Sequence, residues 1–209
     1  MFDIEYKGGN AVVIATKKIK IMIDPKLSEL GLKDPTTKDA VVVATDPQLA
    51  IRSDDSLVTI DGPGEYEMSD VSIKAIAVDR YDTPKGSKEL TMYRIEIGDI
   101  RIAVLGNIAP ELTENQLETL GMVDMVVLPV GAGGTLSATQ ASQLVRTIDA
   151  KVVVPVHYAD KALTYGEPQE GLDAFEKEFG GEIEQTPKYK VKSSASIPVV
   201  NTIIEISRS

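Results

Sequence analysis

Short apolar runs separated by turn residues fill the first hundred positions, a pattern typical of β-strands. The run from Ala40 to Ala44 is unbroken, which indicates a strand buried on both faces of a sheet. Gly98 and Asp99 separate two further runs, so we expect a hairpin whose glycine suits a type II′ turn. The strands predicted in this half span residues 11–15, 19–23, 40–44, 57–60, 71–78, 93–97 and 100–105.

The second half alternates between helical and strand patterns. Thr113 and Ser137 each stand three residues before a glutamine, which is the capping-box arrangement that opens a helix. A third helix, with apolar positions from Leu172 to Phe179, is expected to end at the glycines that follow it. Strands are predicted at 123–129, 151–155 and 202–206. Because no linker or repeat interrupts this pattern, we expect one domain over residues 1–209, of α/β (α+β) class, with sheets covered by helices.

Charge narrows the range of partners. The formal net charge is −10 and the isoelectric point is near 4.7, so the protein is acidic. Such a surface repels phosphate backbones and anionic lipid headgroups, and we therefore expect no nucleic-acid partner and no membrane partner. The two densest basic clusters, Lys17–Lys20 and Lys188–Lys192, are interpreted as solvent-facing strand positions or turns.

The absence of cysteine limits the chemistry further. It excludes disulfides, cysteine-ligated zinc and thiolate nucleophiles. No apolar run approaches the roughly 20 residues that a membrane-spanning helix needs. The first residues form neither the basic nor the apolar segment of a secretion signal. We therefore expect a cytoplasmic protein.

Several polar side chains follow predicted strands, where ligand-binding groups collect in α/β sheets. The only histidine, His157, comes just after the strand that ends near Pro155, and it is either a functional imidazole or a packed one. Asp24, Asp46 and Asp79 also follow strands, although aspartate is common in turns for local reasons. One imidazole alone cannot hold a catalytic zinc ion, which needs about three protein ligands.

Two glycine-containing loops can likewise be interpreted as functional or as purely structural. Gly106–Asn107 follows a strand, and a purely structural turn explains both residues. The loop at 129–134 precedes the helix that begins after Ser137, and its amide groups could receive an anion. It matches neither a Walker A motif nor a dinucleotide fingerprint, so we interpret it as a tightly turning loop.

Taken in order, five segments resemble the metallo-β-lactamase-fold proteins, in particular the branch of the ascorbate-6-phosphate lactonases. They are the strand ending in Asp-Pro, the following apolar strand, a Gly-Pro-Gly-Glu-Tyr turn, a Val-Asp strand ending in Pro-Val-Gly, and a Pro-X-His-Tyr ending. In this chain they lie at 21–25, 41–45, 62–66, 123–131 and 155–158. The resemblance covers the whole chain and implies a four-layer αββα sandwich with a metal site at one edge of its two sheets.

The chain departs from this family at its metal ligands. The resemblance implies a His-X-His-X-Asp-His signature where Thr45–Ala50 stand, and a further histidine where Asp79–Asp82 stand. The bridging aspartate of the family is replaced by Asn107, a weaker metal ligand. Only His157 and the supporting carboxylate of Asp24 remain. A hydrolytic site with two metals needs several imidazoles and a bridging carboxylate, so we expect no metal cofactor.

Three hypotheses follow from this pattern. The leading one is a member of the fold that lacks zinc-dependent hydrolysis and serves as a binding or assembly module for a small molecule or a protein. The alternative is a diverged hydrolase of a small phosphorylated or lactone-like metabolite, with His157 assisted by Asp24, Asp46 or Asp79 and with weakly bound Zn, Mn or Mg. The third is assembly into a homo-oligomer. Asn107 completes the set of candidate residues for a remnant cleft.

Overall fold

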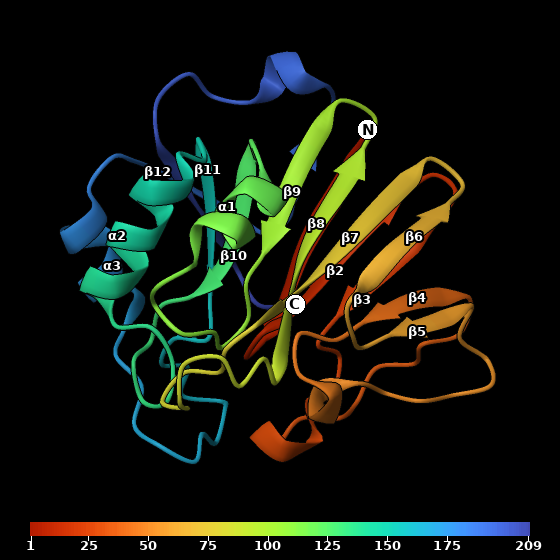
Figure 1. The fold of residues 1–209 in the computed structure, drawn as a ribbon, viewed down its shortest axis with the longest axis horizontal. Helices are drawn as coiled ribbons and strands as arrows, with labels where there is room; N and C mark the ends of the chain where they lie inside the picture. Colours follow the sequence, from red (N-terminus) through yellow and green to blue (C-terminus); the bar gives the residue numbers. More distant parts are fainter.

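Two β-sheets packed face to face form the framework of the protein (Figure 1), which a computed structural model describes over residues 1–209. The six-stranded sheet has the order β13-β1-β2-β3-β4-β5, and the eight-stranded sheet has the order β12-β14-β11-β10-β9-β8-β7-β6. The strands are β1 Phe2–Gly8, β2 Ala11–Thr16, β3 Lys20–Ile23, β4 Ala40–Val43, β5 Val58–Ile60, β6 Gly64–Met68, β7 Val71–Val78, β8 Leu90–Ile97, β9 Ile100–Val104, β10 Met125–Pro129, β11 Val152–Val156, β12 Glu182–Thr186, β13 Tyr189–Val191 and β14 Thr202–Ile206.

The helices are fewer and shorter than the strands. They are α1 Glu114–Leu120, α2 Ala138–Ile148 and α3 Leu172–Phe179, with the 3₁₀ turns η1 Ser28–Leu30, η2 Pro47–Leu49 and η3 Ser194–Ser196. The capping boxes predicted at Thr113 and Ser137 are confirmed, since each side chain accepts from the backbone N–H three residues on and each glutamine bonds back. None of the helices is long and apolar enough to cross a bilayer.

The main core lies between the sheets and follows from strand alternation. In β1 the side chains of Phe2, Ile4 and Tyr6 are buried, while the residues between them are partly exposed. Together with the inward faces of the other strands they form a cluster of 29 buried residues. Burial of this size is the main stabilising contribution to the fold.

The α-helices cover one sheet only. Their apolar faces pack on the outer face of the eight-stranded sheet, in a second cluster of 23 buried residues, and Figure 1 shows α2 and α3 beside β10 and β11. The outer face of the six-stranded sheet carries no α-helix, only the small apolar cluster of Val13, Met22 and Ala40. The expected mixed α/β class with two sheets is confirmed, whereas the expected outer helical layer forms on one side. The connection that could have supplied the other layer is polar and contains Gly31 and Pro35, so it folds no further than η1.

Candidate functional site

The carboxyl ends of the parallel strands from both sheets meet at one edge of the sandwich. β9, β10 and β11 run parallel, as do β3 and β4, and Figure 1 shows β9 and β10 pointing to the same edge. Backbone bonds join the sheets there: Thr91 N–H donates to the Thr45 carbonyl at 2.9 Å, and His157 N–H donates to the Gly9 carbonyl at 2.8 Å. A cavity of about 70 Å³ lies at this edge, lined by Asn10, Asp24, Lys26, Leu27, Glu29, Leu30, Leu49, Asn107 and His157.

His157 is held in one orientation by a single amide. The Gln169 amino group donates to the carbonyls of Gly133 and Glu167, each at 3.0 Å, so its amide oxygen is left as the acceptor. That oxygen lies 3.1 Å from Nδ1 of His157. Nδ1 must therefore carry the proton, and Nε2, which makes no hydrogen bond, presents a lone pair. Burial lowers the pKa of His157, although the bond to Gln169 opposes this, so the ring is neutral at pH 7.

Asp24 is a buried carboxylate with both oxygens engaged. Oδ1 accepts from the Thr45 backbone N–H at 2.7 Å, and Oδ2 accepts from the Thr45 hydroxyl at 2.6 Å. Only 2% of the residue is exposed. Burial raises the pKa of Asp24 to about 7, even though the two bonds from Thr45 act to lower it. This group is therefore a carboxyl that titrates near neutrality.

Two asparagines form an amide pair across the cavity. Asn10 donates from its amino group to the side-chain carbonyl of Asn107 at 3.0 Å. The side-chain carbonyl oxygen of Asn10 has no partner, although only 7% of the residue is exposed. A buried polar atom without a partner is costly, which marks the position as one that a ligand or water can satisfy. Asn10 was not among the candidate residues predicted from the sequence, because β1 was not predicted and the turn that carries Asn10 was not assigned to any element.

Asp46 lies near this edge but acts as a local structural group. Its side chain accepts from the Gln48 N–H at 3.0 Å and so caps η2. The other oxygen pairs with Nη1 of Arg80 at 2.8 Å. Asp46 does not line the cavity that contains His157.

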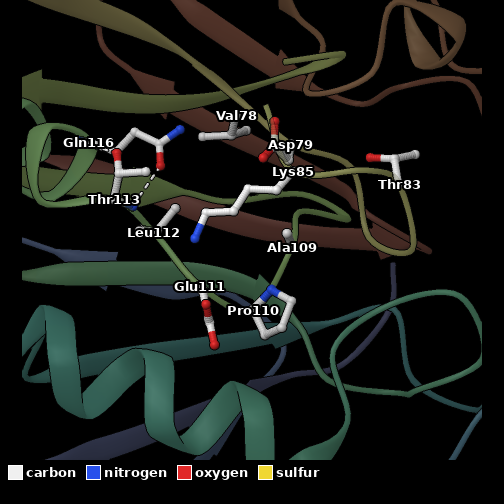
Figure 2. A pocket seen from close by; sticks show the side chains of 10 residues that line it. All are labelled: Val78, Asp79, Thr83, Lys85, Ala109, Pro110, Glu111, Leu112, Thr113 and Gln116. Atoms are coloured by element: carbon white, nitrogen blue, oxygen red, sulfur yellow. Dashed lines mark hydrogen bonds between the residues drawn. The ribbon is translucent and has the colours of Figure 1, made fainter. Parts of the chain in front are cut away.

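Asp79 is placed in a different cavity, of about 160 Å³, shown in Figure 2. Its carboxylate accepts from the backbone N–H groups of Gly86 and Lys88, at 2.7 and 2.8 Å. These bonds hold the pKa of Asp79 below its usual value. In Figure 2 the side chain of Lys85 extends across this cavity toward Leu112. The structure therefore brings Asp24, Asn107 and His157 together and leaves Asp46 and Asp79 outside.

The glycine-rich loop predicted at 129–134 packs against the loop that carries Gln169. The Gly131 carbonyl accepts from the Glu170 N–H at 2.6 Å. A Cβ atom on Gly131 would lie 2.2 Å from the carbonyl oxygen of His157, so only glycine fits. The loop thus packs against the backbone of His157. It also holds Gln169, whose amide oxygen bonds to the His157 ring.

Replacing Gln169 with leucine is expected to change which tautomer of the His157 ring predominates. Without the amide oxygen, Nδ1–H loses its acceptor, so the neutral ring should populate the Nε2–H form and the pKa of His157 should fall further. ¹⁵N NMR distinguishes the two tautomers, and the signals need no assignment because the chain has one histidine. Gln185→Leu, on an exposed strand, is the matched control. An unchanged tautomer in Gln169→Leu would show that Gln169 does not orient the ring.

Comparison with known proteins agrees with this architecture. A family model described as a β-lactamase superfamily domain matches residues 3–157. A UPF0173 protein of Pyrococcus abyssi is 30% identical over 107 residues, which is 51% of this chain and 46% of that protein. A second, from Pyrococcus furiosus, is 33% identical over 119 residues, or 55% of this chain and 49% of the relative. The matched region is thus about half the length of these curated relatives.

Solved structures show the same fold at low sequence identity. A Thermotoga maritima protein described as a Zn-dependent hydrolase of the metallo-β-lactamase superfamily superposes with a TM-score of 0.76 at 21% identity, over 99% of each chain. Igni18, a metallo hydrolase from Ignicoccus hospitalis, gives a TM-score of 0.63 at 16% identity, over 99% of this chain and 94% of its own. Because the family model spans most of the sequence, this chain belongs to the β-lactamase superfamily that the model describes, and the solved structures show that it has the metallo-β-lactamase fold.

Proposed function

We propose that this protein is a member of the metallo-β-lactamase fold that does not carry out zinc-dependent hydrolysis and uses the cavity beside His157 as a binding site. The observation that carries the proposal is the arrangement of the side chains that could serve as metal ligands. No group of three or more His, Asp or Glu side chains is arranged to hold a metal ion. A catalytic zinc needs about three protein ligands and an open position.

The individual donors support the same conclusion. Both oxygens of Asp24 already accept from Thr45, and Asp46 is neutralised by Arg80. Asn107, an amide, occupies the position where the resemblance implies a bridging carboxylate, and its oxygen accepts from Asn10. A single imidazole beside a carboxyl and an amide whose oxygens are already hydrogen-bonded does not fit the donor set of a hydrolytic zinc centre.

One observation favours a second candidate function. His157 lines the cavity and is neutral, and its Nε2 makes no hydrogen bond, which is the state a general base requires. In a diverged hydrolase it would take a proton from water attacking a small phosphorylated or lactone-like substrate. This candidate needs substrate to reach Nε2 within hydrogen-bond distance, and the cavity of about 70 Å³ admits only a small part of such a molecule.

The purified protein is expected to contain far less than one transition-metal ion per chain by elemental analysis. Excess Zn²⁺ should leave its midpoint of thermal unfolding unchanged. A metal that did bind the folded protein, at about 100 times its dissociation constant, would instead add about 2.7 kcal/mol to the free energy of unfolding. A stoichiometric metal, or zinc-dependent hydrolysis of esters, lactones or phosphodiesters, would overturn the proposal.

The variant His157→Asn separates the two candidate functions. Asparagine tolerates the positive φ of 51° at this position better than alanine does, so the fold should persist. Metal-free hydrolysis that disappears in His157→Asn and persists in Asp46→Asn would favour the general-base candidate over the binding module.

A further inference from the structure

We propose that the cavity between Asn10, Asp24 and His157 binds a small primary ammonium ion, or the ammonium end of a small amine, through hydrogen bonds to neutral acceptors. The inference deepens the proposed function and rests on it, since it treats the cavity as a binding site without metal. It names the class of ligand: a cation that donates hydrogen bonds from nitrogen.

Two residues that line the cavity, Asn10 and His157, carry acceptor atoms without a hydrogen-bond partner. His157 offers the Nε2 lone pair, because Gln169 fixes the proton on Nδ1. Asn10 offers its side-chain oxygen, which is buried and without a partner. The backbone bond from His157 to Gly9 holds these two residues side by side. Two acceptors at one small cavity call for a ligand with at least two donors.

The charges around the cavity disfavour an anionic ligand. Four ionisable side chains line the cavity: Asp24, Lys26, Glu29 and His157. Lys26 and Glu29 form an ion pair at 2.6 Å and cancel one another. No unpaired lysine or arginine is left at the cavity to attract an anion, and the protein carries a net charge of −10. The field in the cavity therefore favours a cation over a carboxylate or phosphate.

The size of the cavity limits the ligand to a few atoms. The cavity measures about 70 Å³, whereas pockets for drug-sized ligands measure about 300–1,000 Å³. One water molecule takes about 30 Å³ of liquid, so the space admits a group of two or three non-hydrogen atoms. An ammonium group on a short alkyl chain has this size and supplies the required donors.

The lone histidine makes a direct test possible. Methylammonium chloride, titrated to about 100 mM, is expected to shift the His157 Nε2 signal saturably, with a dissociation constant of about 10 mM, as befits a ligand of two heavy atoms. Tetramethylammonium chloride carries the same charge without donors, sodium acetate offers an anion, and sodium chloride controls for ionic strength. None of these three should produce a saturable shift.

Variants connect the binding to the named acceptor. Asn10→Ala is expected to weaken methylammonium binding about tenfold, the effect of one hydrogen bond to a charged group. Asn10→Asp retains an acceptor at the same place and should bind at least as tightly as the wild type. Asn115→Ala, on the exposed side of α1, is the matched control and should bind like the wild type.

Three outcomes would overturn the inference: no saturable shift with methylammonium, an equal response to tetramethylammonium, or binding of acetate instead. Acetate binding would mean that the Asn10–Asn107 pair has the opposite orientation and presents an amino group. The failure of the proposed function has a separate signature, since Zn²⁺ would then perturb the His157 signals whether or not methylammonium does.

Discussion

Replacing Gly131 with alanine is expected to lower the free energy of unfolding by about 3 kcal/mol or more, the upper range for overpacking a rigid interior. The new Cβ atom would lie 2.2 Å from the His157 carbonyl oxygen and 2.9 Å from the Tyr158 Cα, both of them backbone atoms. It would also lie 2.8 Å from the Gln169 amide oxygen. For a chain of this length the midpoint of thermal unfolding should fall by roughly 6–12 °C.

The same substitution should also change the candidate site. Displacement of Gln169 would disturb its bond to His157, so the ¹⁵N spectrum should show a mixture of tautomers. Gly166→Ala is the matched control: it lies on the opposing loop, no atom lies within 4 Å of its Cβ position, and it needs no positive φ. Its effect should stay within about 0.5 kcal/mol. Equal melting curves for the two variants would show that the loops separate easily and do not support His157.

Local signals were sufficient for the helices and for most strands. The capping boxes at Thr113 and Ser137 and the glycine at 180 defined helix ends because residues within one turn determine them. The Gly98–Asp99 hairpin was likewise confirmed by direct pairing of Ile97 with Ile100. Predictions of this kind succeed because the residues that determine these elements lie within a few positions of one another in the sequence.

The elements that escaped prediction depend on partners far along the chain. All but the last residue of β12, Glu182–Thr186, are exposed, so it lacks the apolar alternation that predicts a strand and forms only by pairing with β14. β6 begins at Gly64, inside the segment interpreted as a turn, and is held only by β7. β13 is three residues long and pairs with β1 at the opposite end of the sequence.

The site shows the same division between local and distant contacts. Of the five candidate residues, Asp24, Asn107 and His157 lie together because each follows a strand whose carboxyl end reaches one edge. Asp79 follows a strand too, but its carboxylate is occupied by the N–H groups of the loop at 86–88. Gln169 had no signal of its own, because its role comes from contacts with Gly133 and His157, which lie in other loops.

Replacing Asp24 with asparagine is expected to stabilise the protein at neutral and alkaline pH, although it alters a buried polar residue. Asparagine tolerates the φ of 45° at this position, can accept from the Thr45 N–H, and can donate to the Thr45 hydroxyl oxygen. It removes the charge that the buried site disfavours. The measurement is the free energy of unfolding, from denaturant titration, at a series of pH values.

The sign follows from proton linkage. The pKa of Asp24 is about 7 in the folded protein and 3.8 for the unperturbed group, so between these values the folded state holds a proton that the unfolded chain has lost. The wild type therefore loses stability as pH rises from about 4 to about 7, by up to about 4 kcal/mol from this group. Asp24→Asn should lack this decline, match the wild type near pH 4 and exceed it at pH 8.

A second carboxylate provides a control of opposite sign. The N–H groups of Gly86 and Lys88 lower the pKa of Asp79, so this residue contributes stability above its unfolded pKa that is lost as pH falls. Asp79→Asn should thus be less stable than the wild type at pH 8 and approach it in acid. If Asp24→Asn instead followed the Asp79→Asn curve, Asp24 would be an ionised, stabilising carboxylate. The cavity would then hold a fixed negative charge, and the ammonium ion proposed there would bind more tightly as a result.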